Sequence, residues 1–142
     1  MDDDEDEREF SRSIVYGFFT QAKETFIDMD IHMYVTDLAA TMTNTLTVTR
    51  KDKDLSGLSS KGHFLKGSSA TLGFTKIKDE CEKIQNYGRK KDETGTNDVS
   101  DEEKLLRLIE EALTEAKRAY KVIEALMKKF YSEAKNQKKD SE

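Results

Sequence analysis

Apolar side chains recur every three or four residues in four separate stretches of the chain, which is the period of an amphipathic α-helix. These stretches predict helices over residues 7–29, 55–72, 76–90 and 101–134. The face of the first helix is expected to contain Phe10, Ile14, Phe18, Ala22, Phe26 and Met29, widened by Val15 and Phe19. The face of the last is expected to contain Leu105, Ile109, Ala112, Ala116, Ala119, Ile123, Leu126 and Phe130.

Residues at the ends of these stretches are of kinds that cap helices. Asp54, Thr75 and Ser100 can each act as an N-cap, because their side-chain oxygens can accept a hydrogen bond from an N–H group of the first turn. Ser100 and Glu103 have the spacing of a capping box. Gly73 is expected to end the second helix, since glycine tolerates a left-handed backbone.

Two segments do not follow the helical period. In residues 30–53, threonines alternate with Leu46 and Val48 as in a strand, but the sequence contains no partner strand. We therefore expect this segment to be a long, poorly ordered, threonine-rich insertion with a weak helix over 35–42. Residues 92–99 are expected to be an ordinary polar loop.

Four amphipathic helices without a sheet indicate an all-α fold, most simply an antiparallel four-helix bundle. The chain has 142 residues, no proline and 37% charged residues, which suits one helical domain with large solvated faces. We expect the bundle to span residues 7–134, between an acidic, flexible N-terminus (1–6) and a polar tail (135–142).

Charge and cysteine content exclude several classes of protein. The net charge is −5, and residues 1–10, with seven acids and one arginine, carry −6, so the remaining chain carries +1 and has no nucleic-acid-binding character. No apolar run reaches the length of a membrane span, and the acidic start does not resemble a signal peptide. Cys81 lies on the apolar stripe of its helix and is expected in the core. We expect a protein of the cytoplasm and nucleus.

The candidate for chemistry is His63, in the second predicted helix. It lies about 200° around the helix from the inward-facing Leu65, so its imidazole is expected to face solvent. A neutral imidazole nitrogen is a good nucleophile near pH 7. Lys66 lies one turn further on and can offset the charge of a phosphoryl group, and Gly67 leaves room for another protein to approach.

The third helix is expected to supply a partner for this histidine. If the chain reverses at residues 73–74, His63 and Gln85 lie at equal distances from the reversal and therefore side by side. Gln85 could then hydrogen-bond one ring nitrogen and leave the other accessible. Arg89 lies one turn beyond Gln85 and could sense a bound phosphoryl group.

Each of these residues also has a purely structural interpretation. His63 could be an ordinary surface histidine, Gly62 and Gly67 could serve close helix packing, and Gln85 and Arg89 could be plain surface residues. The other histidine, His32, has no evident ligand partner. The sequence contains no phosphate-binding glycine loop and no Ser/His/Asp set, so we expect no kinase activity and no ATP binding.

The segments around these residues resemble the fungal histidine-containing phosphotransfer proteins of multistep phosphorelays. The resemblance rests on two runs, His63-Phe64-Leu65-Lys66-Gly67-Ser68-Ser69-Ala70-Thr71-Leu72-Gly73 and Cys81-Glu82-Lys83-Ile84-Gln85-Asn86-Tyr87-Gly88-Arg89-Lys90, and extends more loosely over most of the chain. Two features depart from the family pattern. The sequence begins at the acidic run, where such proteins usually have a preceding short helix, and residues 30–53 replace a link that is normally short.

The resemblance implies a four-helix bundle in which Nε2 of His63 is the phosphoacceptor. It further implies that Lys66 and Arg89 are basic residues near the phosphoryl group, that Gly67 keeps the site open, and that Gln85 hydrogen-bonds the imidazole. The expected partners are the receiver domain of a hybrid sensor histidine kinase and those of response regulators, in stress signalling. The receiver supplies the aspartate and Mg²⁺, so we expect no cofactor or metal on this chain.

We expect receivers to dock on an apolar rim that includes Ile14, Phe18 and Phe64 next to Gly67, with the chain acting as a monomer. Two alternatives remain open. One is a non-catalytic helical adaptor that binds receiver-like partners, and the other is a metal-binding helical protein. The metal alternative would need a second ligand four residues after His63, and that residue is Gly67.

Overall fold

The computed structural model describes residues 2–42 and 47–140, with side chains for residues 5–33 and 55–133. The described chain forms the helices α1 (Asp2–Met42), α2 (Thr47–Thr71), α3 (Thr75–Gly88) and α4 (Glu102–Asp140). Within the described residues, the extended pairing is limited to one antiparallel bridge between Lys91 and Asp98.

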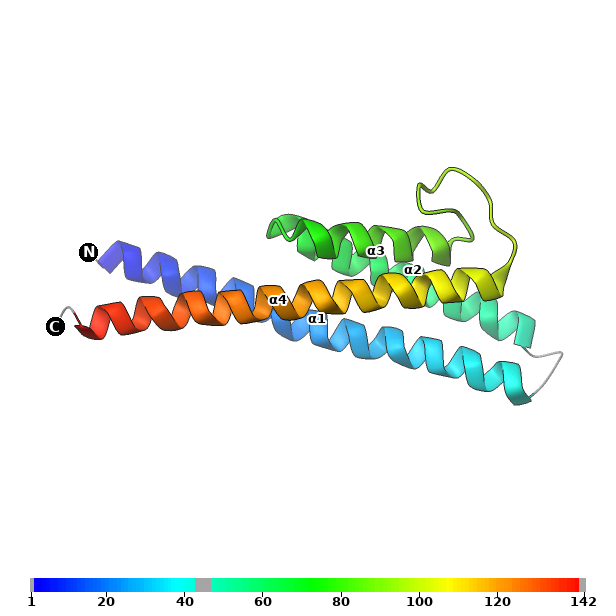
Figure 1. The fold of residues 1–142 in the computed structure, drawn as a ribbon, viewed down its shortest axis with the longest axis horizontal. Helices are drawn as coiled ribbons and strands as arrows, with labels where there is room; N and C mark the ends of the chain where they lie inside the picture. The colour runs from blue at the N-terminus through cyan, green and yellow to red at the C-terminus, as the bar shows by residue number, and fades with distance from the viewer. Residues whose placement is uncertain (1, 43–46, 141–142) are drawn as a thin grey trace.

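The helices form an up-and-down bundle (Figure 1). α1 packs against α2 and α4, and α3 packs against the same two helices. Each helix runs opposite in direction to its neighbours, which confirms the predicted all-α antiparallel four-helix bundle. α1 and α4 are much longer than α3, and together they extend past the turn between α2 and α3, so both chain ends lie at the same end of the molecule (Figure 1).

The core is formed by apolar side chains from all four helices. Its members include Phe19, Ala22, Phe26 and Met29 of α1, Leu58 and Leu65 of α2, Ile77, Cys81 and Ile84 of α3, and Leu105, Ile109 and Ala116 of α4. None of the described helices has an apolar stretch long enough to cross a lipid bilayer.

The expected end of the first helix at Met29 is wrong, because α1 continues to Met42. The residues after Met29 contain no glycine or proline, and tertiary contacts hold their first turn in place. Asp30 forms an ion pair with Lys117 of α4 at 2.7 Å, and Met33 packs against the core. These contacts stabilise the helix directly after Met29, where the sequence pattern did not indicate one, and the helix predicted over residues 35–42 is confirmed as the end of α1.

The boundaries of the threonine-rich segment were also wrong. α2 begins at Thr47, so Asp54 lies within the helix instead of capping it, and only residues 43–46 of the expected insertion lie outside the described chain. At the two chain ends, α1 begins at Asp2 and α4 continues to Asp140, so most of the segments expected to flank the bundle are helical.

Part of the predicted apolar faces is exposed. Phe10 and Ile14 of α1 and Leu126 and Phe130 of α4 are 69%, 43%, 58% and 54% exposed. The N-terminal part of α1 and the C-terminal part of α4 extend past the α2–α3 turn, where α2 and α3 do not cover them (Figure 1). The apolar period is thus continuous along each long helix, but only the part that α2 and α3 cover becomes core.

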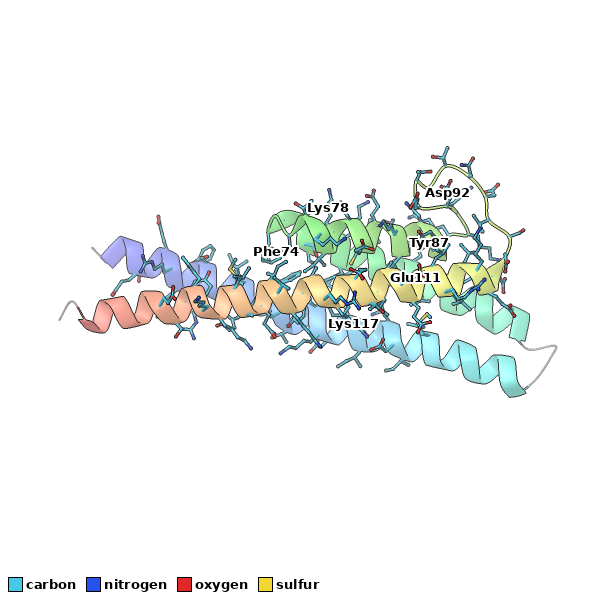
Figure 2. All side chains as sticks on the ribbon, viewed as in Figure 1. Phe74, Lys78, Tyr87, Asp92, Glu111 and Lys117 are labelled. Carbon is cyan, nitrogen blue, oxygen red and sulfur yellow. The ribbon has the colours of Figure 1, made fainter. Side chains whose placement is uncertain are left out.

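The turn from α2 to α3 is closed by Gly73, as predicted. Its φ of +76° places it in the left-handed region that favours glycine. The N–H groups of Gly73 and Phe74 donate to the carbonyl oxygens of Ala70 and Ser69 at 3.2 and 2.9 Å, which is the pattern of a Schellman motif. Phe74 then turns its ring towards α1, where it lies 5.1 Å from the ring of Phe18 (Figure 2).

The starts of α3 and α4 differ from the predicted caps by one residue. Phe74 is the N-cap of α3 and Thr75 is its first helical residue, because the Schellman motif already occupies the preceding positions. In α4, the carboxylate of Asp101 accepts from the backbone N–H of Lys104 at 3.2 Å, so Asp101 is the cap and Ser100 is not.

The polar loop between α3 and α4 is organised by one carboxylate, that of Asp92 (Figure 2). It accepts hydrogen bonds from the hydroxyl and N–H groups of Thr94, the N–H group of Thr96 and the side-chain amide of Asn97. These bonds, led by those from Thr94 and Asn97, hold the pKa of the Asp92 carboxyl well below its usual range. The loop is therefore a defined turn that leads the chain from α3 into α4.

The backbones of α2 and α3 approach closely at Gly88. A Cβ atom at this position would lie 2.6 Å from the carbonyl oxygen of Leu55 and 2.8 Å from the backbone nitrogen of Ser59. Both are main-chain atoms of a helix and cannot move aside without shifting α2. Only glycine at position 88 permits this helix separation.

We therefore predict that Gly88→Ala lowers the free energy of unfolding by about 1–3 kcal/mol, because the added methyl group forces α2 and α3 apart. The measurement is urea unfolding followed by circular dichroism. The matched control is Gly17→Ala in α1, where nothing lies within 4 Å of the new Cβ. It should be neutral or raise stability by up to about 1 kcal/mol. Equal stabilities for the two variants would contradict this account.

Cys81 is fully buried in the core, and burial, aided by the nearby Glu80, raises the pKa of its thiol to about 12. The thiolate is the form that reacts with thiol reagents. We predict that a disulfide reagent at pH 8 labels the folded protein negligibly and labels one thiol per chain after denaturation. Rapid labelling of the folded protein would show that Cys81 is accessible.

Candidate functional site

The site lies at a second position where the backbones of α2 and α3 approach closely, around Gly62. A Cβ atom on Gly62 would lie 2.9 Å from the carbonyl oxygen of Cys81 and 3.0 Å from the backbone nitrogen of Gln85. Gly62 is therefore a packing glycine, which was the structural alternative considered for it. Its position next to His63 brings the backbone of α3 directly beside the histidine.

His63 is exposed on the outer surface of α2, as its angular position predicted. Its Nδ1 atom lies 3.1 Å from the side-chain nitrogen Nε2 of Gln85, so the predicted side-by-side placement is confirmed. Within the described residues, no hydrogen bond to Nε2 of the imidazole is formed. One ring nitrogen is therefore held by the protein, and the other is available to a visiting molecule.

Gln85 is buried, with 5% of its surface exposed, although it carries a polar side chain. Its backbone carbonyl accepts a hydrogen bond from the hydroxyl of Ser59 at 2.9 Å, which ties α3 to α2 one turn before His63. The side-chain amide that holds the imidazole is thus itself held by packing, and the backbone from which it projects is held by a second hydrogen bond. A site supported in this way keeps its geometry well defined.

Lys66 supplies positive charge one helical turn after His63. Its Nζ atom lies 3.4 Å from Oε1 of Glu82 and 3.5 Å from Oε1 of Gln85. At these distances charge–charge and charge–dipole attraction hold the ammonium group beside the site without a short hydrogen bond. Lys66 is one-third exposed, so it can reach a group that binds at His63.

Gly67 completes the exposed surface beside the histidine. It is exposed, and a Cβ atom there would have no atom within 4 Å, so Gly67 is not needed for packing inside this chain. The two glycines that bracket His63 therefore have different physical roles. Gly62 allows α2 and α3 to pack closely, whereas Gly67 leaves the surface beside His63 free of a side chain.

Arg89 is less closely associated with the site. It directly follows α3, and its backbone N–H donates to the carbonyl oxygen of Asn86 at 3.1 Å. Its exposed side chain makes no hydrogen bond or ion pair with the described residues, and Arg89 lies on the opposite side of Gln85 from Lys66 along the helix. The structure therefore does not place the guanidinium group at His63.

Two residues were not identified from the sequence. Glu82, the anionic partner of Lys66, was not among the predicted site residues, and its i−3 spacing from Gln85 on the same helix was the available signal. His32, for which the sequence indicated no role, packs its ring against Gly57 of α2, where a Cβ atom would lie 2.7 Å from the ring carbon Cε1. His32 thus has a packing role outside the site.

The predicted docking residues divide into two groups. Ile14 and Phe64 are 43% and 49% exposed and can contact a partner. Phe18 is 3% exposed and packs against Phe74, so its inclusion in the docking rim was wrong. Phe18 lies on the part of α1 that the α2–α3 turn covers.

A comparison with protein families agrees with this geometry. A family model described as the Hpt domain matches residues 29–119, which include His63, Lys66, Gly67, Gln85 and Arg89. The chain belongs to the Hpt domain family.

Curated relatives of this Hpt chain come from fungi. It is 41% identical over 129 residues to "Multistep phosphorelay regulator 1" of Schizosaccharomyces pombe, covering 91% of this chain and 38% of that protein. It is 47% and 38% identical over 87 residues to the "Phosphorelay intermediate protein YPD1" of Candida albicans and of Saccharomyces cerevisiae. These two matches cover 61% of this chain and 38% and 42% of the relatives. The chain thus spans well under half the length of these relatives.

Proposed function

We propose that this Hpt chain is a phosphorelay intermediate that carries a phosphoryl group on Nε2 of His63. The donor is the phosphoaspartate of a receiver domain on a hybrid sensor histidine kinase, and the acceptor is the receiver-domain aspartate of a response regulator. The observation that carries the proposal is the exposed imidazole whose Nδ1 atom is held by the buried Gln85. Family membership and the names of the fungal relatives support it.

The geometry suits a transfer in which positioning does most of the work. The lone pair of Nε2 attacks phosphorus, the bond from phosphorus to the aspartate oxygen breaks, and the carboxylate leaves with the electron pair. Lys66 lessens the repulsion between the anionic groups as they approach. The receiver would supply the Mg²⁺, so this chain needs no metal ligand of its own. We further propose that the carrier acts as a monomer and is present in the cytoplasm and the nucleus.

We predict that His63→Gln folds normally and accepts no phosphoryl group, because the substitution removes the only exposed imidazole among the described residues. The measurement uses a receiver domain carrying radiolabelled phosphoaspartate, with Mg²⁺, and follows label on this chain in an acid-labile, base-stable bond. His32→Gln is the matched control, since it removes the other histidine and should retain labelling.

Label of the same chemistry on His63→Gln would refute the assignment of the acceptor. If receivers bind the wild-type chain but no label moves from any of them, the chain is an adaptor that binds without phosphotransfer.

For docking, we predict that Phe64→Ala raises the Kd for a receiver domain about tenfold, which corresponds to a loss of about 1–2 kcal/mol of binding free energy. The reason is that an exposed aromatic side chain beside the reacting atom is a typical interface anchor. The measurement is isothermal titration calorimetry. The control is Ile27→Ala, an apolar residue of α1 that is 58% exposed and belongs to neither the core nor the predicted rim. If both variants bind like wild type, the receiver docks elsewhere.

A further inference from the structure

The side-chain amide of Gln85 lies between Lys66 and His63, and a different atom of the amide faces each of them. On one side is the ammonium group of Lys66, which has only donors, so the atom of Gln85 next to it must be the acceptor Oε1, at 3.5 Å. The amide NH₂ group then faces Nδ1 of His63, at 3.1 Å. An NH₂ group can only donate, so Nδ1 must accept with its lone pair.

This arrangement determines which ring nitrogen carries the proton. A neutral imidazole has one protonated and one unprotonated nitrogen, and the hydrogen bond to one nitrogen decides the state of the other. We infer that Lys66, acting through the amide of Gln85, holds the unphosphorylated His63 in the tautomer that carries its proton on Nε2, and that Lys66 must leave Oε1 before Nε2 can accept a phosphoryl group. This inference deepens the proposed function and rests on it for its second part.

Phosphoryl acceptance needs the other tautomer, because the lone pair that attacks phosphorus must be on Nε2. The proton then belongs on Nδ1 and needs an acceptor, so the amide of Gln85 must turn over and present Oε1 to the ring. While Lys66 remains in place, this rotation would bring the NH₂ group of Gln85 against the ammonium group of Lys66. Both groups can only donate hydrogen bonds, so this contact is unfavourable. Gln85 is 5% exposed, so solvent has little access to relieve that conflict.

Glu82 gives Lys66 an alternative partner. Its carboxylate lies 3.4 Å from Nζ of Lys66, on the side away from His63 along α3, and is itself half exposed. An approaching phosphoryl group offers a second anionic partner. Glu82 keeps the ammonium group beside the site at rest, and movement of Lys66 onto the phosphoryl group frees Oε1 and allows the amide to rotate. The ring then loses its proton from Nε2 to water and gains one from water on Nδ1, which makes Nε2 nucleophilic. The accepting tautomer is thereby coupled to the arrival of the anion.

The resting orientation also suits the phosphorylated ring. After transfer, the bond from Nε2 to phosphorus has replaced the aspartate oxygen–phosphorus bond, and the proton on Nδ1 is released to water. The lone pair left on Nδ1 can again accept from the NH₂ group of Gln85, with Lys66 back on Oε1. An imidazole departs readily from phosphorus only when Nδ1 is protonated, so this orientation retains the phosphoryl group until a receiver displaces Lys66.

The test is nitrogen-15 NMR of the unphosphorylated protein, labelled at histidine and recorded at a pH where the ring is neutral. Protonated and unprotonated ring nitrogens have well-separated chemical shifts, and His32→Gln identifies the signals of His63. We expect the wild-type ring to carry its proton on Nε2. Lys66→Met should raise the population protonated on Nδ1, and Gln85→Glu should reverse the tautomer, because a carboxylate can only accept.

The matched control is Lys61→Met, which removes another lysine of α2, one that pairs with Asp28 of α1 at 3.2 Å and should leave the tautomer unchanged. A wild-type ring protonated on Nδ1, or a Lys66→Met spectrum identical to that of wild type, would overturn the inference. The spectra need neither a receiver nor a phosphoryl group. The tautomer inference can therefore fail or hold independently of the phosphotransfer assay that tests the proposed function.

Discussion

The contact that the rest of the site depends on is the close approach of the α2 and α3 backbones at Gly62 and Gly88. At both positions a single added carbon would meet main-chain atoms of the facing helix at 3 Å or less. Because main-chain atoms cannot rotate away, the two glycines set both the separation and the register of the helices. That register places Gln85 beside His63 and Glu82 beside Lys66.

The site is consequently exposed but not loosely held. His63 and Gly67 face outward from a helix whose opposite side carries the fully buried Leu58 and Leu65. Gln85 enters from a second helix and is fixed by burial and by the hydroxyl of Ser59. A reacting group on rigid elements is positioned more accurately than one on a loop. In the proposed role as a carrier between receiver domains, this fixed orientation lowers the entropy lost at each encounter.

The same bundle leaves apolar surface uncovered where it becomes a pair of helices. Beyond the α2–α3 turn, α1 and α4 pack only against each other among the residues that the structure describes. Contacts such as the 2.8 Å hydrogen bond between Ser11 and Tyr131 join them there. Phe10 and Phe130 remain exposed for that reason. The extent of the core is therefore set by where α2 ends and α3 begins, on either side of the Schellman motif around Gly73.

The sequence alone determined the features that depend on local spacing. These are the helical class, the break at Gly73, the outward direction of His63 and, from equal distances to the chain reversal, its pairing with Gln85. Only the tertiary structure decided how far α1 extends, that Phe18 is core, and that Lys66 is shared between Glu82 and Gln85. The physical reason is that periodicity specifies which side of a helix a residue occupies, whereas burial and pairing depend on which other element lies opposite, and that partner is distant in the chain.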